Sequence, residues 1–214
     1  MLRKLLICAA LVAGSAGANA GPLLLDEGFN DLVLPDWYYA NLTNPGSLPW
    51  FQGNTGIFDA ADGPADSYVA ANFTAAGAAN SIDAWLLTPL MTVTTGVADL
   101  TFSTKTAGGL GGDSIEVLVS SGDTFDLNSY VSLGVIAAGS YPADWTAFTF
   151  RYYGAAADVR FAFRYLVDDL TVHGDYIGID SVTVYDVPEP GTLALLAVGM
   201  LLAPLMLRRR RAKI

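Results

Sequence analysis

The chain has 214 residues, a formal net charge of −10 at pH 7, and a hydrophobic content of 52%. All 21 acidic residues lie between positions 21 and 190, but only four basic residues do. This segment therefore carries a net charge of −17. Such an acidic surface repels nucleic acids and anionic lipids, which excludes both as its partners. The single cysteine, Cys8, precedes the segment, which excludes disulfides, thiol catalysis and zinc–thiolate sites from it.

The first 20 residues contain the parts of a secretory signal peptide in the usual order. Residues 3–4 are basic, residues 5–12 are apolar, and Ala18-Asn19-Ala20 is an A-x-A cleavage site. We therefore expect signal peptidase to recognise Ala18 and Ala20 and to cut before Gly21. The predicted organisation is a signal peptide at 1–20, one folded domain at 21–186 and a separate C-terminal segment at 187–214.

The predicted domain is built of short strands. Polar and apolar residues alternate with period two, and clusters of Gly, Pro, Asn and Asp separate the runs. Many short strands with such turns indicate an all-β fold, either a sandwich or a jelly roll. The strands are expected at Leu23–Gly28, Ser67–Phe73, Trp85–Val93, Asp99–Thr104, Ser114–Ser120, Ser129–Ile136, Ala147–Tyr152, Val159–Tyr165 and Tyr176–Val184.

Residues 35–65 show little strand pattern and are expected to form a long loop rich in aromatic residues. Sugar rings stack on aromatic faces, so Tyr38, Tyr39 and Phe51 are candidate ligand-binding residues. Adjacent side chains of an extended chain point to opposite sides, so at most one of the two tyrosines is free for a ligand. The alternative is packing in the core, which we expect for Trp37 and Trp50.

Acidic residues near the two ends of the domain are candidate calcium ligands. The first and last strands of a jelly roll are often neighbours, which would bring Glu27 near Asp180, and Asp66 from a loop could join them. Carboxylate and carbonyl oxygens are the ligands that Ca²⁺ prefers. A structural calcium ion is the only expected cofactor. The alternative is that each carboxylate is solvated or caps a turn.

No catalytic residue is expected. His173 is the only histidine, and the chain has no Gly-x-Ser-x-Gly motif, so the sequence does not support a Ser-His-Asp triad. The glycines of residues 108–112 lack the Lys-Ser/Thr of a phosphate-binding loop. A glycoside hydrolase needs only two carboxylates flanking a cleft, and 21 acidic residues leave this alternative open.

The C-terminal segment has three parts in sequence. Val187-Pro188-Glu189-Pro190 opens it, an apolar run from Leu193 to Leu207 follows, and a basic block closes it. A helix over residues 192–207 would be about 24 Å long, shorter than the roughly 30 Å hydrocarbon core of a bilayer. The basic block would stay on the cytoplasmic side as a membrane stop. It consists of Arg208, Arg209, Arg210 and Arg211.

With these three parts, residues 187–211 resemble the PEP-CTERM sorting signal of Gram-negative bacteria. The resemblance implies that an exosortase, a membrane protease–transpeptidase, recognises Val187, Pro188, Glu189 and Pro190 and removes the tail. The protein would be anchored transiently in the inner membrane and then delivered to the cell surface or the extracellular matrix. The alternative is an ordinary single-span anchor. Both interpretations place the domain outside the inner membrane.

Several blocks of the predicted domain carry a second resemblance. They are Asp26-Glu27-Gly28-Phe29, Leu34-Pro35-Asp36-Trp37, Asp83-Ala84-Trp85-Leu86-Leu87-Thr88-Pro89 and Ile179-Asp180-Ser181-Val182.

These blocks resemble the choice-of-anchor J domain, which is related to cleaved-adhesin and MAM-like jelly rolls. The resemblance implies a non-enzymatic jelly-roll module displayed for adhesion or for contact with carbohydrate, here with exopolysaccharide or another glycan. Two alternatives stay open. One is a glycan hydrolase that uses two carboxylates, and the other is a passive structural envelope protein without a ligand.

Overall fold

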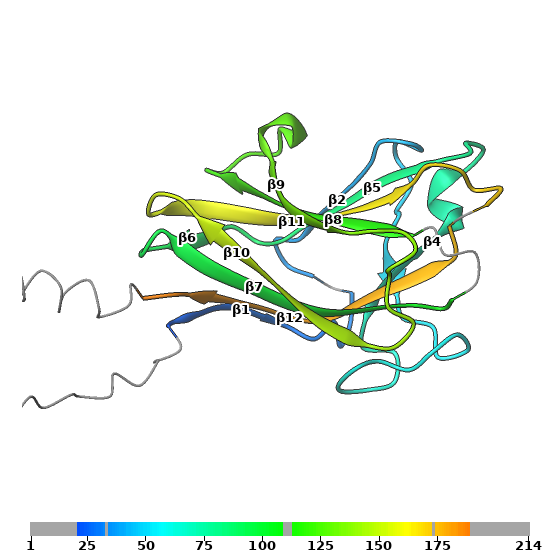
Figure 1. The fold of residues 1–214 in the computed structure, drawn as a ribbon, viewed down its shortest axis with the longest axis horizontal. Coiled ribbons are helices and arrows are strands. Elements are labelled where there is room, and N and C mark those ends of the chain that lie inside the picture. Colours follow the sequence, from blue (N-terminus) through cyan, green and yellow to red (C-terminus); the bar gives the residue numbers. More distant parts are fainter. Residues whose placement is uncertain (1–20, 33, 109–112, 173, 189–214) are drawn as a thin grey trace, which may run out of the picture. The chain divides into compact units, whose positions relative to one another are not determined.

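The computed structural model describes residues 21–32, 34–108, 113–172 and 174–188. The strands of these residues form two antiparallel sheets that face each other (Figure 1). The described residues contain almost no helix, only two short 3₁₀ turns, η1 (Phe73–Ala76) and η2 (Leu127–Ser129). The expected all-β jelly-roll sandwich is therefore confirmed.

The first sheet holds the first and the last strand of the described chain. Its order is β10-β7-β12-β4-β3, and β1 pairs with β12, with Glu27 opposite Val182. The expectation that the first and last strands are neighbours is thus confirmed. The strands are β1 (Leu23–Glu27), β3 (Phe51–Gln52), β4 (Val69–Asn72), β7 (Val97–Thr106), β10 (Thr146–Tyr153) and β12 (Tyr176–Asp186).

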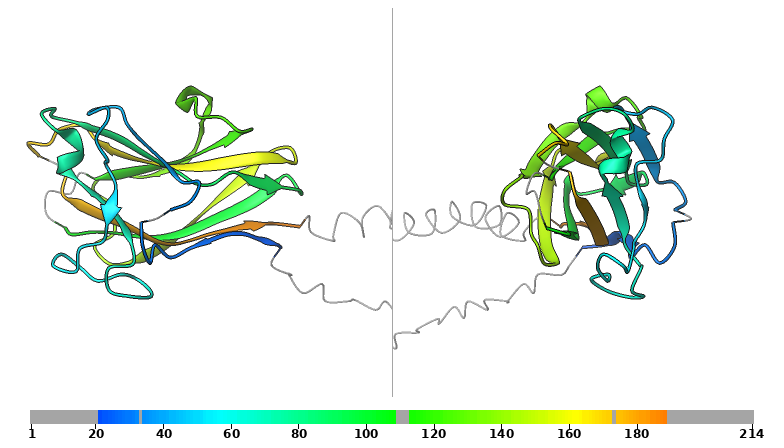
Figure 2. Two further views of the ribbon diagram at one scale, coloured as in Figure 1. Left: turned by 180° about the vertical axis from the view of Figure 1, so that it is seen from behind. Right: turned by 90° about the vertical axis from the view of Figure 1, so that its right-hand side faces the viewer.

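The second sheet carries the side chains that form the candidate site. Its order is β2-β5-β11-β8-β9, and β6 pairs with one end of β11. The strands are β2 (Tyr38–Asn41), β5 (Ile82–Leu87), β6 (Met91–Val93), β8 (Ser114–Ser121), β9 (Val131–Ile136) and β11 (Ala157–Val167). Figure 2 shows the same two layers from behind and from one end.

The core lies between the sheets, as period-two alternation requires. Every second residue of β7 is buried, including Leu100 and Phe102. The ring of Phe102 meets the ring of Phe163 from the opposite sheet edge-on, with 4.8 Å between the centroids. Each such buried side chain contributes about 1.5–3 kcal/mol to folding. Packing therefore stabilises this domain without disulfides.

Two predictions about the strands and loops need correction. The strand expected at Trp85–Val93 is two strands, β5 and β6, because Pro89 has no N–H for the ladder. Thr88 closes the break, since its N–H donates to the carbonyl of Phe161 and its hydroxyl accepts the Phe161 N–H. The loop expected at residues 35–65 also contains two short strands, β2 and β3.

Candidate functional site

The outer face of the second sheet carries aromatic and charged side chains. On β5, Ala84 and Leu86 point into the main core, so Trp85 and Leu87 point outward. On β11, Phe161 and Phe163 lie in the main core in the same way, which turns the neighbouring side chains outward. The outward side chains of β11 are Arg160, Ala162 and Arg164.

A pocket of about 260 Å³ lies at one end of this face and is called the Arg160 pocket. The Arg160 side chain is almost fully buried, and its guanidinium carbon lies 4.9 Å from the ring centroid of Tyr38 and 4.8 Å from that of Phe125. The two rings also touch edge-on, with 4.3 Å between their centroids. The pocket is lined by Asp36, Tyr38, Pro89, Leu90, Asp123, Phe125 and Arg160.

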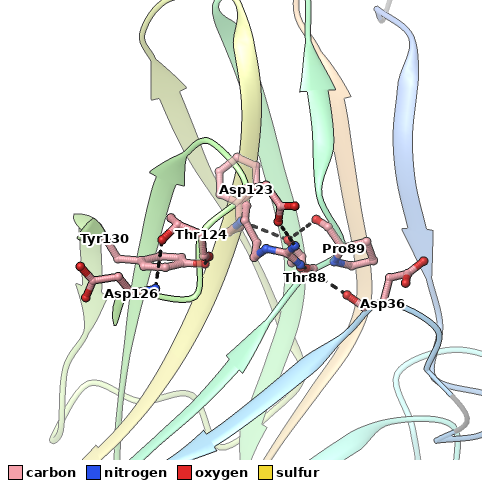
Figure 3. A network of polar contacts seen from close by, with 9 residues as sticks. Asp36, Thr88, Pro89, Asp123, Thr124, Asp126 and Tyr130 are labelled. Atoms are coloured by element: carbon pink, nitrogen blue, oxygen red, sulfur yellow. Dashed lines mark hydrogen bonds and ion pairs between the residues drawn. The ribbon is translucent and has the colours of Figure 1, made fainter. Parts of the chain in front are cut away.

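Hydrogen bonds from Arg160 hold together three loops around this pocket (Figure 3). Its Nη1 donates to the carbonyl oxygens of Thr88 at 2.7 Å and Asp36 at 3.5 Å. Its Nη2 pairs with the exposed Asp123 carboxylate at 3.1 Å. Its Nε is buried and has no hydrogen-bond partner among the described residues. Arg160 therefore fixes the loops around the pocket.

A second pocket, of about 350 Å³, lies further along the same face and is called the Arg164 pocket. Arg164 donates two hydrogen bonds to Asp83, at 2.7 and 2.8 Å, and one to Glu116 at 3.2 Å. Its guanidinium lies over the ring of Trp85, 5.0 Å from the centroid. Trp85 and Tyr130 meet edge-on, and burial raises the pKa of Tyr130 to about 12. The two arginines are four positions apart on β11, which is about 13 Å along the strand.

Of the three aromatic candidates, Tyr38 lines one of the two pockets described above. Tyr38 is 39% exposed and lines the Arg160 pocket. Tyr39, next to it in β2, packs against the main core, where burial raises the pKa of its hydroxyl. The expectation that at most one of the pair faces outward is confirmed. Phe51 lies in the first sheet, edge-on to Tyr176.

Phe51 belongs to an aromatic cluster on the outer face of the first sheet, which the loop of residues 53–67 covers. The Tyr68 hydroxyl donates to the carbonyl oxygens of Asn54 and Phe58 and shares a hydrogen bond of 3.1 Å with the hydroxyl of Tyr176. Tyr68 is fully buried, and its burial raises the pKa of the hydroxyl. We call this the closed cluster, and its members are Phe51, Phe58, Ala60, Tyr68, Ala70, Trp145 and Tyr176.

Two of the three predicted calcium ligands lie on paired strands. Glu27 is the last residue of β1, and Asp180 lies in β12 beside it. The Asp180 carboxylate accepts the N–H groups of Ala61 at 2.8 Å and Asp62 at 3.1 Å. Burial raises the pKa of both carboxyl groups, and these N–H donors offset part of the rise at Asp180.

Asp66 contributes a main-chain oxygen to this neighbourhood. The Gln52 side-chain amide donates to the carbonyl oxygens of Phe29 and Asp66, so these two oxygens lie close together. The described residues contain no group of three or more Asp, Glu, His or Cys side chains that could hold a metal ion. A calcium site here would therefore need carbonyl as well as carboxylate ligands, and it stays a prediction.

The predicted processing sites fall mostly outside the described residues. The residues that are not described include the signal peptide, with Ala18 and Ala20, and residues 189–214, with Glu189, Pro190 and the basic block. They also include His173 and residues 109–112. Val187 is described, and its N–H donates to the carbonyl of Val97. Within the described ranges, no helix is both long and apolar enough to cross a bilayer.

Solved structures share this fold. The K1 cleaved adhesin domain of Lys-gingipain from Porphyromonas gingivalis W83 matches with a TM-score of 0.60 and 19% identity, over 75% of this chain and 96% of that chain. TmCBM61, solved in complex with β-1,4-galactotriose, matches with a TM-score of 0.50 and 14% identity, over 73% and 92%. The Stig cyclase Fisc from Fischerella sp. TAU matches with a TM-score of 0.51 and 13% identity, over 79% and 100%.

At these identities the likeness shows the fold alone. The chain has the jelly-roll fold of cleaved adhesin and carbohydrate-binding domains, which confirms that resemblance at the level of the fold. The name choice-of-anchor J stays a prediction. The fold also occurs in a cyclase, so it does not by itself decide between binding and catalysis.

The tail identifies how the protein is handled by the cell. A family model described as the PEP-CTERM protein-sorting motif matches residues 186–211. A comparison with curated proteins found no match. The motif indicates an exported surface protein of a Gram-negative bacterium that is first held in the membrane and then processed by an exosortase.

The sequence pattern missed most of the Arg160 pocket. Asp123 and Phe125 lie in a loop after β8 and carry no periodic signal. Arg160 and Arg164 stand four positions apart in the sequence of one strand, a spacing that places both on the same face, and both pair with acidic residues in the structure. That spacing was the available signal for the site.

Proposed function

We propose that the protein is an exported, non-enzymatic module that binds a glycan of the cell surface or the extracellular polysaccharide matrix. The observation that carries this proposal is the outer face of the second sheet, where two pockets open side by side on β11. Each combines aromatic rings with an arginine and carboxylates, and such groups suit the apolar faces and hydroxyl groups of sugars.

Three features of the Arg160 pocket support a sugar ligand. Tyr38 and Phe125 are 39% and 52% exposed, so their rings are available for contact. Asp36 and Asp123 offer acceptors at the rim. Arg160 holds the loops that carry these groups in place, through its hydrogen bonds to the Thr88 carbonyl and the Asp123 carboxylate.

The export route supports the same proposal. A protein that an exosortase releases from the membrane for delivery to the surface meets the polysaccharide layer there, and the proposed role is attachment to this layer. The galactotriose in the TmCBM61 structure belongs to that protein, but it supports a glycan as the class of ligand for this fold. A structural calcium ion at Glu27, Asp66 and Asp180 is a further part of the proposal and would stabilise the fold away from the pockets.

The test is binding of the protein, as exported by its host, to a panel of surface and matrix glycans. Tyr38→Ala should weaken binding about fivefold or more, because truncating an aromatic residue at the centre of a binding site costs more than about 1 kcal/mol. Tyr153→Ala is the matched control, since Tyr153 is 71% exposed on β10 of the other sheet. It should leave the affinity unchanged.

The same experiment separates the alternatives. Retention of no glycan by the unmodified protein would contradict the proposal and leave a passive structural role. Release of reducing ends from a retained glycan, abolished by Asp123→Asn, would instead identify a hydrolase.

A further inference from the structure

The Arg160 pocket has a surplus of negative charge. Three of its lining side chains are charged, the carboxylates of Asp36 and Asp123 and the guanidinium of Arg160. Arg160 is paired with Asp123 at 3.1 Å, which neutralises the positive charge locally. The lining therefore retains one net negative charge, which the exposed carboxylate of Asp36 supplies.

The surroundings of the pocket add to this surplus. Each arginine among the described residues is paired with a carboxylate, namely Arg151 with Asp99, Arg160 with Asp123, and Arg164 with Asp83 and Glu116. Lys105 lies over the Phe58 ring in the closed cluster, on the other sheet. Residues 21–190 carry −17 in total. A field of this sign attracts cations and repels anionic polymers.

Asp36 is placed to receive a cation. Its carbonyl oxygen accepts a hydrogen bond from Arg160, and its φ of 63° lies in the left-handed region that Asp and Asn tolerate better than other non-glycine residues. The Asp36 carboxylate takes part in no hydrogen bond or ion pair among the described residues. The backbone is therefore fixed while the carboxylate stays available to a ligand.

We infer that the Arg160 pocket takes an amino sugar with a protonated amine, as in a de-N-acetylated hexosamine polymer. This inference rests on the glycan-binding function proposed above. The sugar ring contacts Tyr38 and Phe125, and its ammonium group pairs with the Asp36 carboxylate.

Other classes of ligand fit these observations less well. An acidic sugar would place a carboxylate beside Asp36 and would have to compete with Asp123 for Arg160. A neutral sugar could donate hydroxyl hydrogen bonds to Asp36 and Asp123, but it would form no ion pair in the pocket. A basic peptide would match the charge, but it lacks the rigid ring that Tyr38 and Phe125 are placed to contact.

The test compares probes of one length that differ in charge. Glucosamine hexamers, N-acetylglucosamine hexamers, galacturonate hexamers and lysine hexamers are titrated into the exported protein at low salt. The glucosamine hexamer should bind about fivefold more tightly than its N-acetylated counterpart, the value expected for one ion pair in water. Because salt screens exposed charges, the difference should shrink as the ionic strength rises.

Asp36→Asn sharpens the test. Asparagine keeps the shape and tolerates the left-handed backbone, so the fold should be retained while the charge is lost. The variant should lose most of the fivefold preference for the glucosamine hexamer over the N-acetylglucosamine hexamer. Asp144→Asn removes the same charge from an exposed position ahead of β10 in the other sheet, and it should retain the fivefold preference.

The possible outcomes distinguish failure of the amino-sugar inference from failure of the proposed glycan-binding function. Binding of the N-acetylated or galacturonate hexamer as tightly as the glucosamine hexamer would contradict the amino-sugar inference and leave the glycan-binding function intact. The lysine hexamer binding as tightly would also contradict it, because the pocket would then select charge without the sugar ring. Binding of none of the sugars, together with failure of the wider glycan panel, would overturn the proposed function itself.

Discussion

The outer face of each sheet carries a group of aromatic side chains: the closed cluster on the first sheet and the rings of the Arg160 pocket on the second. The two groups differ in whether their rings are covered by the chain itself. In the closed cluster of the first sheet, the Tyr68 hydroxyl and the Trp145 Nε1 bond to main-chain carbonyls of the covering loop. On the second sheet, Tyr38 and Phe125 stay partly exposed around Arg160. Rings tied to their own backbone stabilise the fold, whereas rings left open beside charged groups can contact a ligand.

The largest effect should come from the closed cluster. Tyr68→Ala removes a fully buried ring and the hydrogen bonds that hold the loop at Asn54 and Phe58. We expect the free energy of unfolding to fall by about 3–5 kcal/mol, measured by chemical denaturation. A loss below about 1 kcal/mol would contradict the structural role of this cluster.

An intermediate effect is expected at the Arg160 pocket. Arg160→Met keeps an unbranched side chain in place of the arginine stem but removes the guanidinium, which leaves the carbonyl of Thr88 and the carboxylate of Asp123 without this donor. We expect a loss of about 2–4 kcal/mol in the free energy of unfolding, together with loss of binding.

Arg151→Met is the matched comparison. Arg151 pairs with Asp99 on the outer face of the first sheet, and its side chain is 45% exposed. Its loss should cost less than about 1 kcal/mol. Equal losses in the two variants would show that Arg160 does not hold the pocket loops together.

The smallest expected effect is the dependence of folding stability on pH. Burial raises the pKa of Asp180 above its ordinary value of 3.8, so the folded protein binds this proton more tightly than the unfolded chain does. This group therefore favours folding most at a pH below 3.8, and the contribution is lost as the pH rises through the folded pKa. Asp180→Asn should flatten this dependence, measured as the midpoint of thermal unfolding from pH 3 to 7.

The midpoint of thermal unfolding, measured with added calcium, also tests the predicted calcium site. If the ion binds the ionised carboxylates, it should raise the unfolding midpoint near pH 7 and lose this effect near pH 3. Asp180→Asn should abolish the rise. An unchanged midpoint on adding calcium at pH 7 would remove the predicted site.

The sequence was sufficient for the fold because buried and less buried side chains alternate along the whole of β7 and along parts of β8, β11 and β12. It was insufficient for β2, since Tyr38 and Tyr39 are both apolar and serve opposite faces, which hides the alternation. The loop after β8 contributes Asp123 and Phe125 through tertiary contacts with Arg160, and no local pattern records such contacts. Phe51 shows the same limit, because composition alone does not distinguish the closed cluster from an open pocket.

The most direct test of the account is the affinity of the exported protein for its glycan in two variants, one from each aromatic cluster. Tyr38→Ala should weaken binding about fivefold or more, while Phe51→Ala should lower stability and leave the affinity of the folded protein unchanged. Unchanged affinity in Tyr38→Ala, or an equal loss in Phe51→Ala, would contradict the claim that the outer face of the second sheet is the binding surface.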